Sequence, residues 1–498
     1  MTTKNTGEME RDRRDISRGA RQILSGFGVR MLARVLLIVF VAKLFGAAVF
    51  GRLGETVAII ELAAAFASFG LTKTLLGEMA RDESVGEHIT TRFVEALILT
   101  GIVSLGLAGV LWSIWPTLFP TDAAPRISVI GVPLIALTDV ALTATRHHRT
   151  VAWDTIVKAA IKPWSFLILA LASYALVTGR FTVTFPNLSM PHALIGAYLG
   201  SLTVSALVAF AATSFMFRGG VKRAPNSREI LGMARRSFPI ALNETGVFAF
   251  RRVDILLLGM VAGPAATGIY YLAQQIGTVV EKVRYLFEPM LAPIIAQSNS
   301  MALIGSHVRR LCLFVFTVQL SLLVLALLNS DGMLMWFGPG FAAGSGVLVL
   351  ILLGELFDGS FGLSELPLIF RHPKWPPRAV LAALAVECAL VMVLARQFGA
   401  AGAAAGFAAS MFVLAVIRLA LVRRKFGFHV ISPVYAGILL AAVLSAIPAF
   451  ALTVYGADAW AVSVAANLIF LLIYGGVAYK LLRSGGRSLT AEITSPSL

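Results

Sequence analysis

Segments of roughly 20 apolar residues recur along the whole chain, and they constrain its fold more than any other feature. A helix of about 20 residues crosses the ~30 Å hydrocarbon core of a bilayer and satisfies its own backbone polar groups there. We count about fourteen such segments, near residues 24–46, 53–76, 93–115, 126–146, 151–177, 192–217, 238–262, 264–297, 308–329, 341–369, 377–398, 400–422, 433–455 and 459–482. The sequence therefore predicts an all-α integral membrane protein.

Composition excludes a soluble protein, because the chain is 58% hydrophobic and only 14% charged. Soluble domains contain about 45–50% apolar and about 25% charged residues. The two cysteines, Cys312 and Cys388, lie inside apolar segments, where a thiol behaves as a small buried hydrophobe. We find no phosphate-binding loop, zinc spacing or nucleophile elbow. The sequence thus predicts no metal, no cofactor and no enzymatic activity.

Basic residues are distributed unevenly between the loops. If the N-terminus is cytoplasmic, the cytoplasmic loops and tails hold roughly 27 Lys and Arg, and the opposite loops about 4. This bias fixes orientation and predicts that both termini face the cytoplasm. The net charge of +16 is then explained by these loops, so it does not indicate a nucleic acid partner.

The loop pattern also predicts the domain organisation. The longest internal loop contains "SREILGMARRSF", in which apolar and basic residues alternate as in a helix lying on the membrane surface. The predicted parts are an N-terminal tail (1–22), an N-lobe (23–217), an amphipathic linker (218–237), a C-lobe (238–424), two further spans (425–484) and a C-terminal tail (485–498).

A weak internal repeat relates the two lobes. Shifting the sequence by 217 positions places Arg34 on Arg251 and Gly46 on Gly263. In both copies a helix with a central arginine ends in a short turn containing glycine. The repeats would be parallel, which predicts two six-helix lobes related by a pseudo-twofold axis along the membrane normal, with two extra C-terminal helices.

Arginines inside the apolar segments are candidates for substrate contact. A central arginine costs about 2.5–3.5 kcal/mol in lipid, so it faces a wet cavity or an acidic partner. Arg30 and Arg34 share one helix face and have no acid in their own segment. An anionic substrate would complement them. The alternative is pairing with Glu61 or Asp254.

Acidic residues near other arginines allow the same two interpretations. Asp254 follows Arg251 by three positions, Glu281 precedes Arg284 by three, and Asp154 and Lys158 are spaced i,i+4. The segment near 341–369 carries Glu355, Asp358 and Glu365, which would bind H⁺ or Na⁺ or neutralise arginines of other helices. From these patterns we predict ion-coupling residues Asp254, Glu281, Glu355 and Asp358.

Three stretches resemble the multidrug/oligosaccharidyl-lipid/polysaccharide exporter superfamily. They are "RRVDILLLGMVAGPAATGIYYLAQQIGTVVEKV" (251–283), "FGAAVFGRLG" followed by "FASFGLTKTLL" (45–76), and "FGAAGAAAGFAAS" (398–410). Within the superfamily the chain most resembles the flippases for O-antigen and exopolysaccharide repeat units. The resemblance covers nearly the whole chain in span number and loop pattern.

The resemblance implies a central cationic cavity and transfer of undecaprenyl-pyrophosphate-linked oligosaccharide from the inner to the outer leaflet of the bacterial cytoplasmic membrane. Membrane lipids and a polysaccharide polymerase are the implied partners. Family-like cavity arginines would fall on Arg30, Arg34, Arg251 and Arg252, and Arg284 completes the predicted substrate-binding set.

Three alternatives remain open from the sequence. A lipid II flippase would bind the same pyrophosphate. A drug or cation antiporter of the superfamily would line its cavity with acids, contrary to the arginines of the first helix. A polysaccharide polymerase or ligase would need large outer loops, whereas the longest outer loop here has about 16 residues.

Overall fold

The computed structural model describes residues 2–83, 89–119, 124–148, 150, 152–179, 188–218, 223–298, 300–455 and 460–494. Within these ranges the chain forms helices and no strand, so the all-α prediction is confirmed. The chain divides into two compact units, unit 1 (Met1–Arg252) and unit 2 (Val253–Leu498). The predicted division at the linker 218–237 differs from this boundary and stays a prediction.

Eleven helical stretches in the described part of the chain are long and apolar enough to cross a membrane, as expected of a multi-pass membrane protein. Three of them, with 43 to 52 residues, are Met31–Ala80, Val253–Ile295 and Trp375–Phe426. A straight helix of 43 residues would measure about 65 Å, twice the bilayer core. Each instead bends at a glycine with positive φ, namely Gly46, Gly263 and Gly399. The count of fourteen crossings stays a prediction.

The bends at Gly46 and Gly263 have nearly the same backbone geometry. Their φ and ψ angles are 78° and 170° at Gly46 and 79° and 178° at Gly263. The chain folds back on itself at Gly263. A hydrogen bond of 3.0 Å from Gln274 to Asp254, twenty positions earlier, shows that the segments on either side of the turn are in contact. Two residues that the internal repeat aligns therefore make the same turn, one in each unit.

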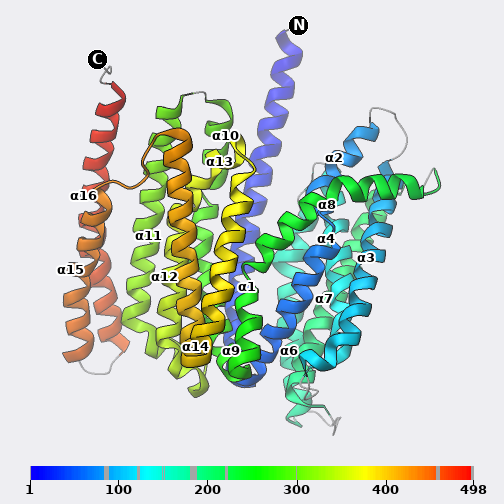
Figure 1. Ribbon diagram of the computed structural model, residues 1–498, viewed down its shortest axis with the longest axis horizontal. Coiled ribbons are helices and arrows are strands. Elements are labelled where there is room, and N and C mark those ends of the chain that lie inside the picture. Colours follow the sequence, from blue (N-terminus) through cyan, green and yellow to red (C-terminus); the bar gives the residue numbers. More distant parts are fainter. Residues whose placement is uncertain are drawn as a thin grey trace. The chain divides into compact units, whose positions relative to one another are not determined.

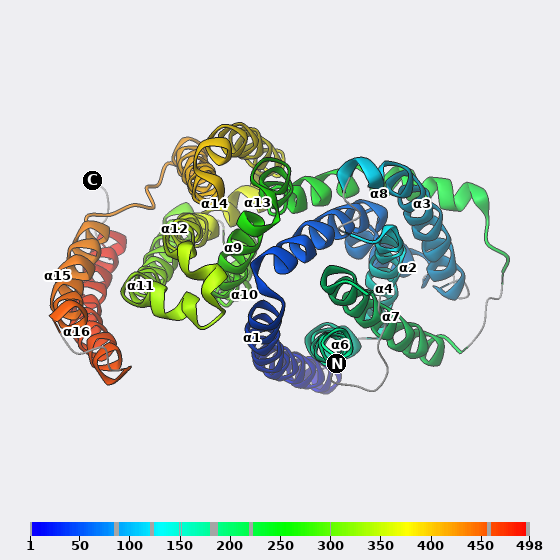
Figure 2. The ribbon, with the colours of Figure 1, turned by 90° about the horizontal axis from the view of Figure 1, so that it is seen from below.

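Unit 1 is a helix bundle in which α1 (Thr2–Ala67) contacts α4, α6, α7 and α8 (Figures 1 and 2). The elements that follow α1 are α2 (Leu71–Glu83), α3 (Ile89–Leu118), η1 (Arg126–Ile130), α4 (Gly131–Thr145), η2 (Arg146–His148), α5 (Ala152–Ile156), η3 (Val157–Ile161), α6 (Lys162–Val177), α7 (Met190–Met216) and α8 (Ser227–Ala249). One buried cluster, which includes Leu71, Leu75 and Met79, joins α2 to α3, α4 and α8.

Helix α8 begins inside the predicted linker and lies across the ends of α2 and α3 (Figure 1). Ion pairs hold it there. Arg236 donates two hydrogen bonds of 2.9 and 2.7 Å to Glu78 on α2, and these bonds raise the pKa of Arg236 above its ordinary value. Arg92 on α3 forms an ion pair of 2.9 Å with Glu229. These ion pairs and the buried cluster together fix the amphipathic helix to the bundle.

The helix predicted near 238–262 is interrupted. Helix α8 ends at Ala249, and α9 begins at Val253. Between them the N–H groups of Arg251 and Arg252 bond carbonyls three residues back, as in a 3₁₀ turn. The carboxylate of Asp254 accepts a hydrogen bond of 2.7 Å from the N–H of Ile255 in the first turn of α9. The charged residues therefore lie at a helix junction rather than in mid-helix.

Gly70 offers a test of how α8 is seated. Its φ is +71°, and an added Cβ would lie 2.8 Å from the backbone N of Ala241 on α8. We expect Gly70→Ala to lower the free energy of unfolding by about 1–3 kcal/mol, because neither the left-handed backbone nor the helix contact tolerates a methyl group. Thermal unfolding in detergent measures this. Gly77→Ala on α2 is the control, since no atom lies within 4 Å of its Cβ, and equal losses in both variants would contradict the prediction.

Unit 2 is built on α12, which packs against α9, α11 and α14 (Figure 2). Its elements are α9 (Val253–Tyr285), α10 (Glu288–Gln297), α11 (Met301–Met335), η4 (Pro339–Gly344), α12 (Ser345–Gly362), η5 (Leu363–Glu365), α13 (Leu366–Arg371), α14 (Trp375–Phe426), α15 (Val434–Tyr455) and α16 (Trp460–Thr494). Helices α15 and α16 pack on each other and on α11, at the edge of the unit in both views.

Candidate functional site

Unit 1 contains a cavity of about 410 Å³. Its wall is formed by α1, α2, α4, α6, α7, α8, the turn η3 and Arg252. Six charged side chains line it, three of each sign, together with apolar and hydroxyl groups. The charged residues are Glu61, Asp139, Glu244, Lys158, Lys162 and Arg252. A polar cavity among helices of membrane-spanning length can accommodate the charged part of an amphiphilic substrate.

A π-helical turn supplies two of the three cations. Lys158 lies within η3, and Lys162 begins α6 directly after it. Residues four apart lie close to one face of an α-helix, and the wider π-turn keeps them close. Both lysines consequently line the cavity. Single π-turns are frequent at functional sites, which supports a functional role for this wall of the cavity.

Lys158 is held by two aspartates. Its ammonium lies 2.8 Å from Asp139 on α4 and 3.1 Å from Asp154. Asp154 also forms an ion pair of 2.6 Å with Arg146. The predicted pair of Asp154 with Lys158 is confirmed, and Asp139 joins it from another helix. Lys158 is therefore oriented before any ligand arrives.

Arg252 and Lys162 share one carboxylate. Arg252 lies 3.1 Å from Glu61 on α1, and Lys162 lies 4.0 Å from the other oxygen of the same group. The Arg252 guanidinium also lies over the ring of Phe248, 5.7 Å from its centre. The sequence proposed Glu61 as a partner of Arg30 or Arg34. The structure pairs it with Arg252, a residue predicted to bind substrate.

The other predicted arginines of unit 1 are distributed differently. Arg34 and Arg251 are half-buried and are not among the residues that line this cavity. The side chain of Arg30 lies outside the described residues. Substrate contact by these three arginines stays a prediction.

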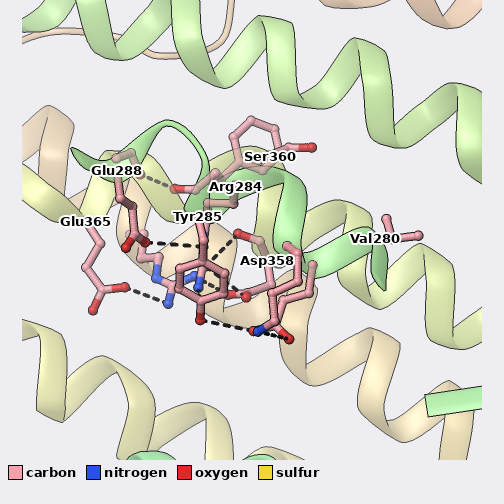
Figure 3. Close-up of polar contacts among 12 residues, drawn as sticks. Val280, Arg284, Tyr285, Glu288, Asp358, Ser360 and Glu365 are labelled. Carbon is pink, nitrogen blue, oxygen red and sulfur yellow. Dashed lines mark hydrogen bonds and ion pairs between the residues drawn. The ribbon is translucent and has the colours of Figure 1, made fainter. Parts of the chain in front are cut away.

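Unit 2 carries a buried ion-pair network (Figure 3). Asp358 on α12 accepts a hydrogen bond of 2.9 Å from Arg284 on α9 and one of 2.6 Å from Arg418 on α14. Arg418 also lies 2.6 Å from Glu365 in η5. Asp358 is only 1% exposed. One carboxylate thus ties together three helices at the core of the unit.

The surroundings of Arg284 complete this network. Arg284 donates a hydrogen bond of 3.0 Å to the Tyr285 hydroxyl, which donates one of 3.0 Å to Glu281. Glu288, at the start of α10, lies 3.5 Å from Arg284. An added Cβ at Gly362 would lie 2.1 Å from the guanidinium, so this glycine makes room for it. The predicted residues Arg284, Glu281 and Asp358 meet here, and their roles in transport stay predictions.

A second group of buried acids lies between α9, α12 and α14. Asp254 is fully buried and accepts hydrogen bonds from the Tyr270 hydroxyl and from Gln274. Glu355 on α12 and Glu387 on α14 are buried and interact electrostatically with the same tyrosine. The predicted ion-coupling residues Asp254 and Glu355 therefore share one region, and Glu387 was not predicted.

Unit 2 also has an apolar groove of about 720 Å³ between α11 and α15. Leucines, valines, alanines, Ile447 and Phe450 line it, and no charged residue contributes to its wall. A groove of this kind accommodates an acyl or prenyl chain rather than a polar group.

Several residues in these sites escaped the sequence interpretation, among them Asp139, Lys162, Glu387 and Arg418. Lys162 follows Lys158 by four positions, a spacing that could have indicated a shared face. Arg418 lies inside the predicted span 400–422 and was not singled out there. Its partner Asp358 lies 60 positions earlier. No local spacing signals a pair of that kind.

Comparisons with known proteins agree with this architecture. A family model described as "Polysaccharide biosynthesis protein" matches residues 40–333, more than half of the chain. The lipid II flippase MurJ, in an inward closed conformation, has a similar structure, with a TM-score of 0.73 and 13% sequence identity. The match covers 93% of this chain and 99% of that one. No curated protein sequence matches the chain.

Transporters of the multidrug resistance MATE family in the MOP superfamily are also similar. An inward-facing structure gives a TM-score of 0.63 at 13% identity, covering 80% of this chain and 94% of that one. An outward-facing structure gives 0.53 at 13% identity, covering 83% and 95%. At such identities the likeness shows a common fold. With the family model covering more than half of its length, this chain belongs to the polysaccharide biosynthesis protein family and has the fold of MurJ and the MATE transporters.

Proposed function

We propose that the protein is a flippase that moves undecaprenyl-pyrophosphate-linked oligosaccharide, an O-antigen or exopolysaccharide repeat unit, from the inner to the outer leaflet. The observation that carries the proposal is the cavity of unit 1, where Lys158, Lys162 and Arg252 converge among membrane-spanning helices. Membership in a polysaccharide biosynthesis family supports the glycan part of the substrate.

The chemistry of the cavity fits a pyrophosphate. Arg252 offers a planar fork of donors that pairs with phosphate oxygens, and the two lysines add mobile point charges. The hydroxyls of Ser68, Thr72 and Ser205 in the same wall provide partners for a sugar. The polyprenyl chain stays in lipid. The polar head is thereby shielded while it crosses.

The remaining predicted residues have proposed roles around this site. Arg30, Arg34 and Arg251 attract the head group to unit 1, and Arg284 holds its place in the network of unit 2. Asp254 and Glu355, buried together with Glu387, bind the coupling H⁺ or Na⁺. Binding of that ion changes the hydrogen bonds of Asp358 with its arginine partners and of Glu281 with Tyr285. The protein resides in the bacterial cytoplasmic membrane with both termini inside, and a polysaccharide polymerase receives its product.

Leaflet transfer in proteoliposomes tests the substrate class. Purified protein is reconstituted with a fluorescent undecaprenyl-pyrophosphate oligosaccharide in both leaflets, and a membrane-impermeant quencher reports the outer fraction. We expect transfer at least ten times faster than in protein-free vesicles. The same assay is run with lipid II and with an organic cation.

Each outcome assigns the chain to a branch. Preference for lipid II over the oligosaccharide would favour a lipid II flippase, which is the function of the structurally similar MurJ. Exchange of the organic cation for H⁺ or Na⁺, without lipid transfer, would favour a drug antiporter. Either result would overturn the proposed substrate.

A further inference from the structure

The cavity of unit 1 has no surplus of positive charge. Its wall carries three cations and three carboxylates. Glu61 forms ion pairs with Arg252 and Lys162, and Asp139 forms one with Lys158. An anion that enters has to take cations away from carboxylates already bound to them. Each carboxylate that loses its partners is left as a negative charge next to another negative charge.

Glu61 is the acid most affected by such an exchange. Its side chain is 19% exposed, compared with 32% for Asp139 and 39% for Glu244. Its cationic partners Arg252 and Lys162 both line the cavity. A half-buried carboxylate that loses two cations and gains an anionic neighbour favours its protonated form.

Few other charged groups near Glu61 could neutralise its carboxylate once its cations have turned to the anion. The titratable groups that share the cavity wall are Asp139 from α4, Lys158 from η3, Lys162 from α6, and Glu244 and Arg252 from α8 and the turn after it. Helices α2 and α7 contribute only uncharged side chains to the wall. Helices α3 and α5 and η1, which also pack against α1, contribute none.

We propose that an anionic head group enters this cavity together with one proton, which Glu61 takes up as Arg252 and Lys162 turn from it to the anion. The inference rests on the proposed function and adds a proton-binding residue at the head-group site to the ion-coupling residues proposed in unit 2. The proton comes from water on the side to which the cavity is open and converts the Glu61 carboxylate to a neutral carboxyl group. On release, Glu61 loses that proton and pairs again with Arg252, which displaces the anion. Anion transfer and proton transfer thus run in the same direction.

Calorimetry on the full-length protein in detergent tests this. Geranyl pyrophosphate is titrated at one pH into buffers of different ionisation enthalpy, and the dependence of heat on buffer gives the protons taken up. We expect wild type to take up about one proton more per bound anion than Glu61→Gln, and its affinity to fall by up to about tenfold per unit of rising pH. The difference between the two proteins cancels protons bound by the ligand itself.

Two further variants assign the proton. Glu244→Gln, which removes a more exposed acid from the same wall, is expected to keep the uptake, and Glu61→Asp is expected to keep it too. Binding by wild type without extra proton uptake would overturn the inference and leave the flippase proposal standing. Uptake that persists in Glu61→Gln and disappears in Asp139→Asn would overturn the assignment to Glu61. Absence of geranyl pyrophosphate binding would contradict the cationic site itself, and with it both proposals.

Discussion

Asp358→Asn is expected to lower the free energy of unfolding by roughly 3–5 kcal/mol, the cost of removing one partner from a buried ion pair. Asp358 is 1% exposed and accepts hydrogen bonds from both Arg284 and Arg418. An amide keeps the shape of the side chain but leaves two buried guanidinium groups with one carboxylate fewer. Thermal or SDS-induced unfolding of the purified protein measures the loss.

The matched control for that variant is Asp331→Asn. Asp331 is an exposed aspartate on α11 that accepts a hydrogen bond from the Ser345 hydroxyl. Surface changes of this kind usually stay within about 0.5 kcal/mol. A loss at Asp358 no larger than that of the control would mean that the network does not hold α9, α12 and α14 together.

Lys158→Met is expected to weaken binding of geranyl pyrophosphate about 100-fold. Loss of a charge-assisted contact costs about 1.5–3 kcal/mol, and each 1.4 kcal/mol corresponds to tenfold in affinity. In addition, Asp139 loses its ion pair of 2.8 Å and then repels the anion. Lys158→Arg, which keeps the charge, should retain most of the affinity. Titration calorimetry measures both.

Lys43→Met provides the control for that substitution. It makes the same chemical change in unit 1 at an exposed lysine of α1 that does not line the cavity. We expect its affinity for geranyl pyrophosphate to match that of wild type. Equal weakening in both variants would indicate a non-specific effect of net charge and would remove Lys158 from the site.

The sequence predicted the parts of this structure that depend on local patterns. Apolar segments of membrane-spanning length gave the helices, and the alignment of Gly46 with Gly263 anticipated two turns of equal geometry. The i,i+4 spacing gave the pair of Asp154 with Lys158. Such features arise from residues close in sequence, where helix geometry alone decides which side chains meet.

Contacts between distant residues were beyond that reasoning. Arg252 and Glu61 are separated by 191 positions, and Arg284 and Asp358 by 74. A single sequence gives no information on which of several acids meets which arginine. The junction at 250–252 was also missed, because apolar residues flank its two arginines on both sides while the backbone turns. The charged pattern of the cavity, with as many acids as cations, emerged only from the packing of α1, α4, η3, α6 and α8.

The most direct test of the central claim is leaflet transfer of undecaprenyl-pyrophosphate oligosaccharide by the double variant Lys162→Gln/Arg252→Gln. The variant keeps polar side chains of similar reach but removes the two cations that Glu61 now holds. With Lys374→Gln, at an exposed residue preceding α14, as the control, we predict a fall of at least tenfold in the variant and none in the control. Transfer at the wild-type rate by a folded double variant would contradict a cationic head-group site in unit 1.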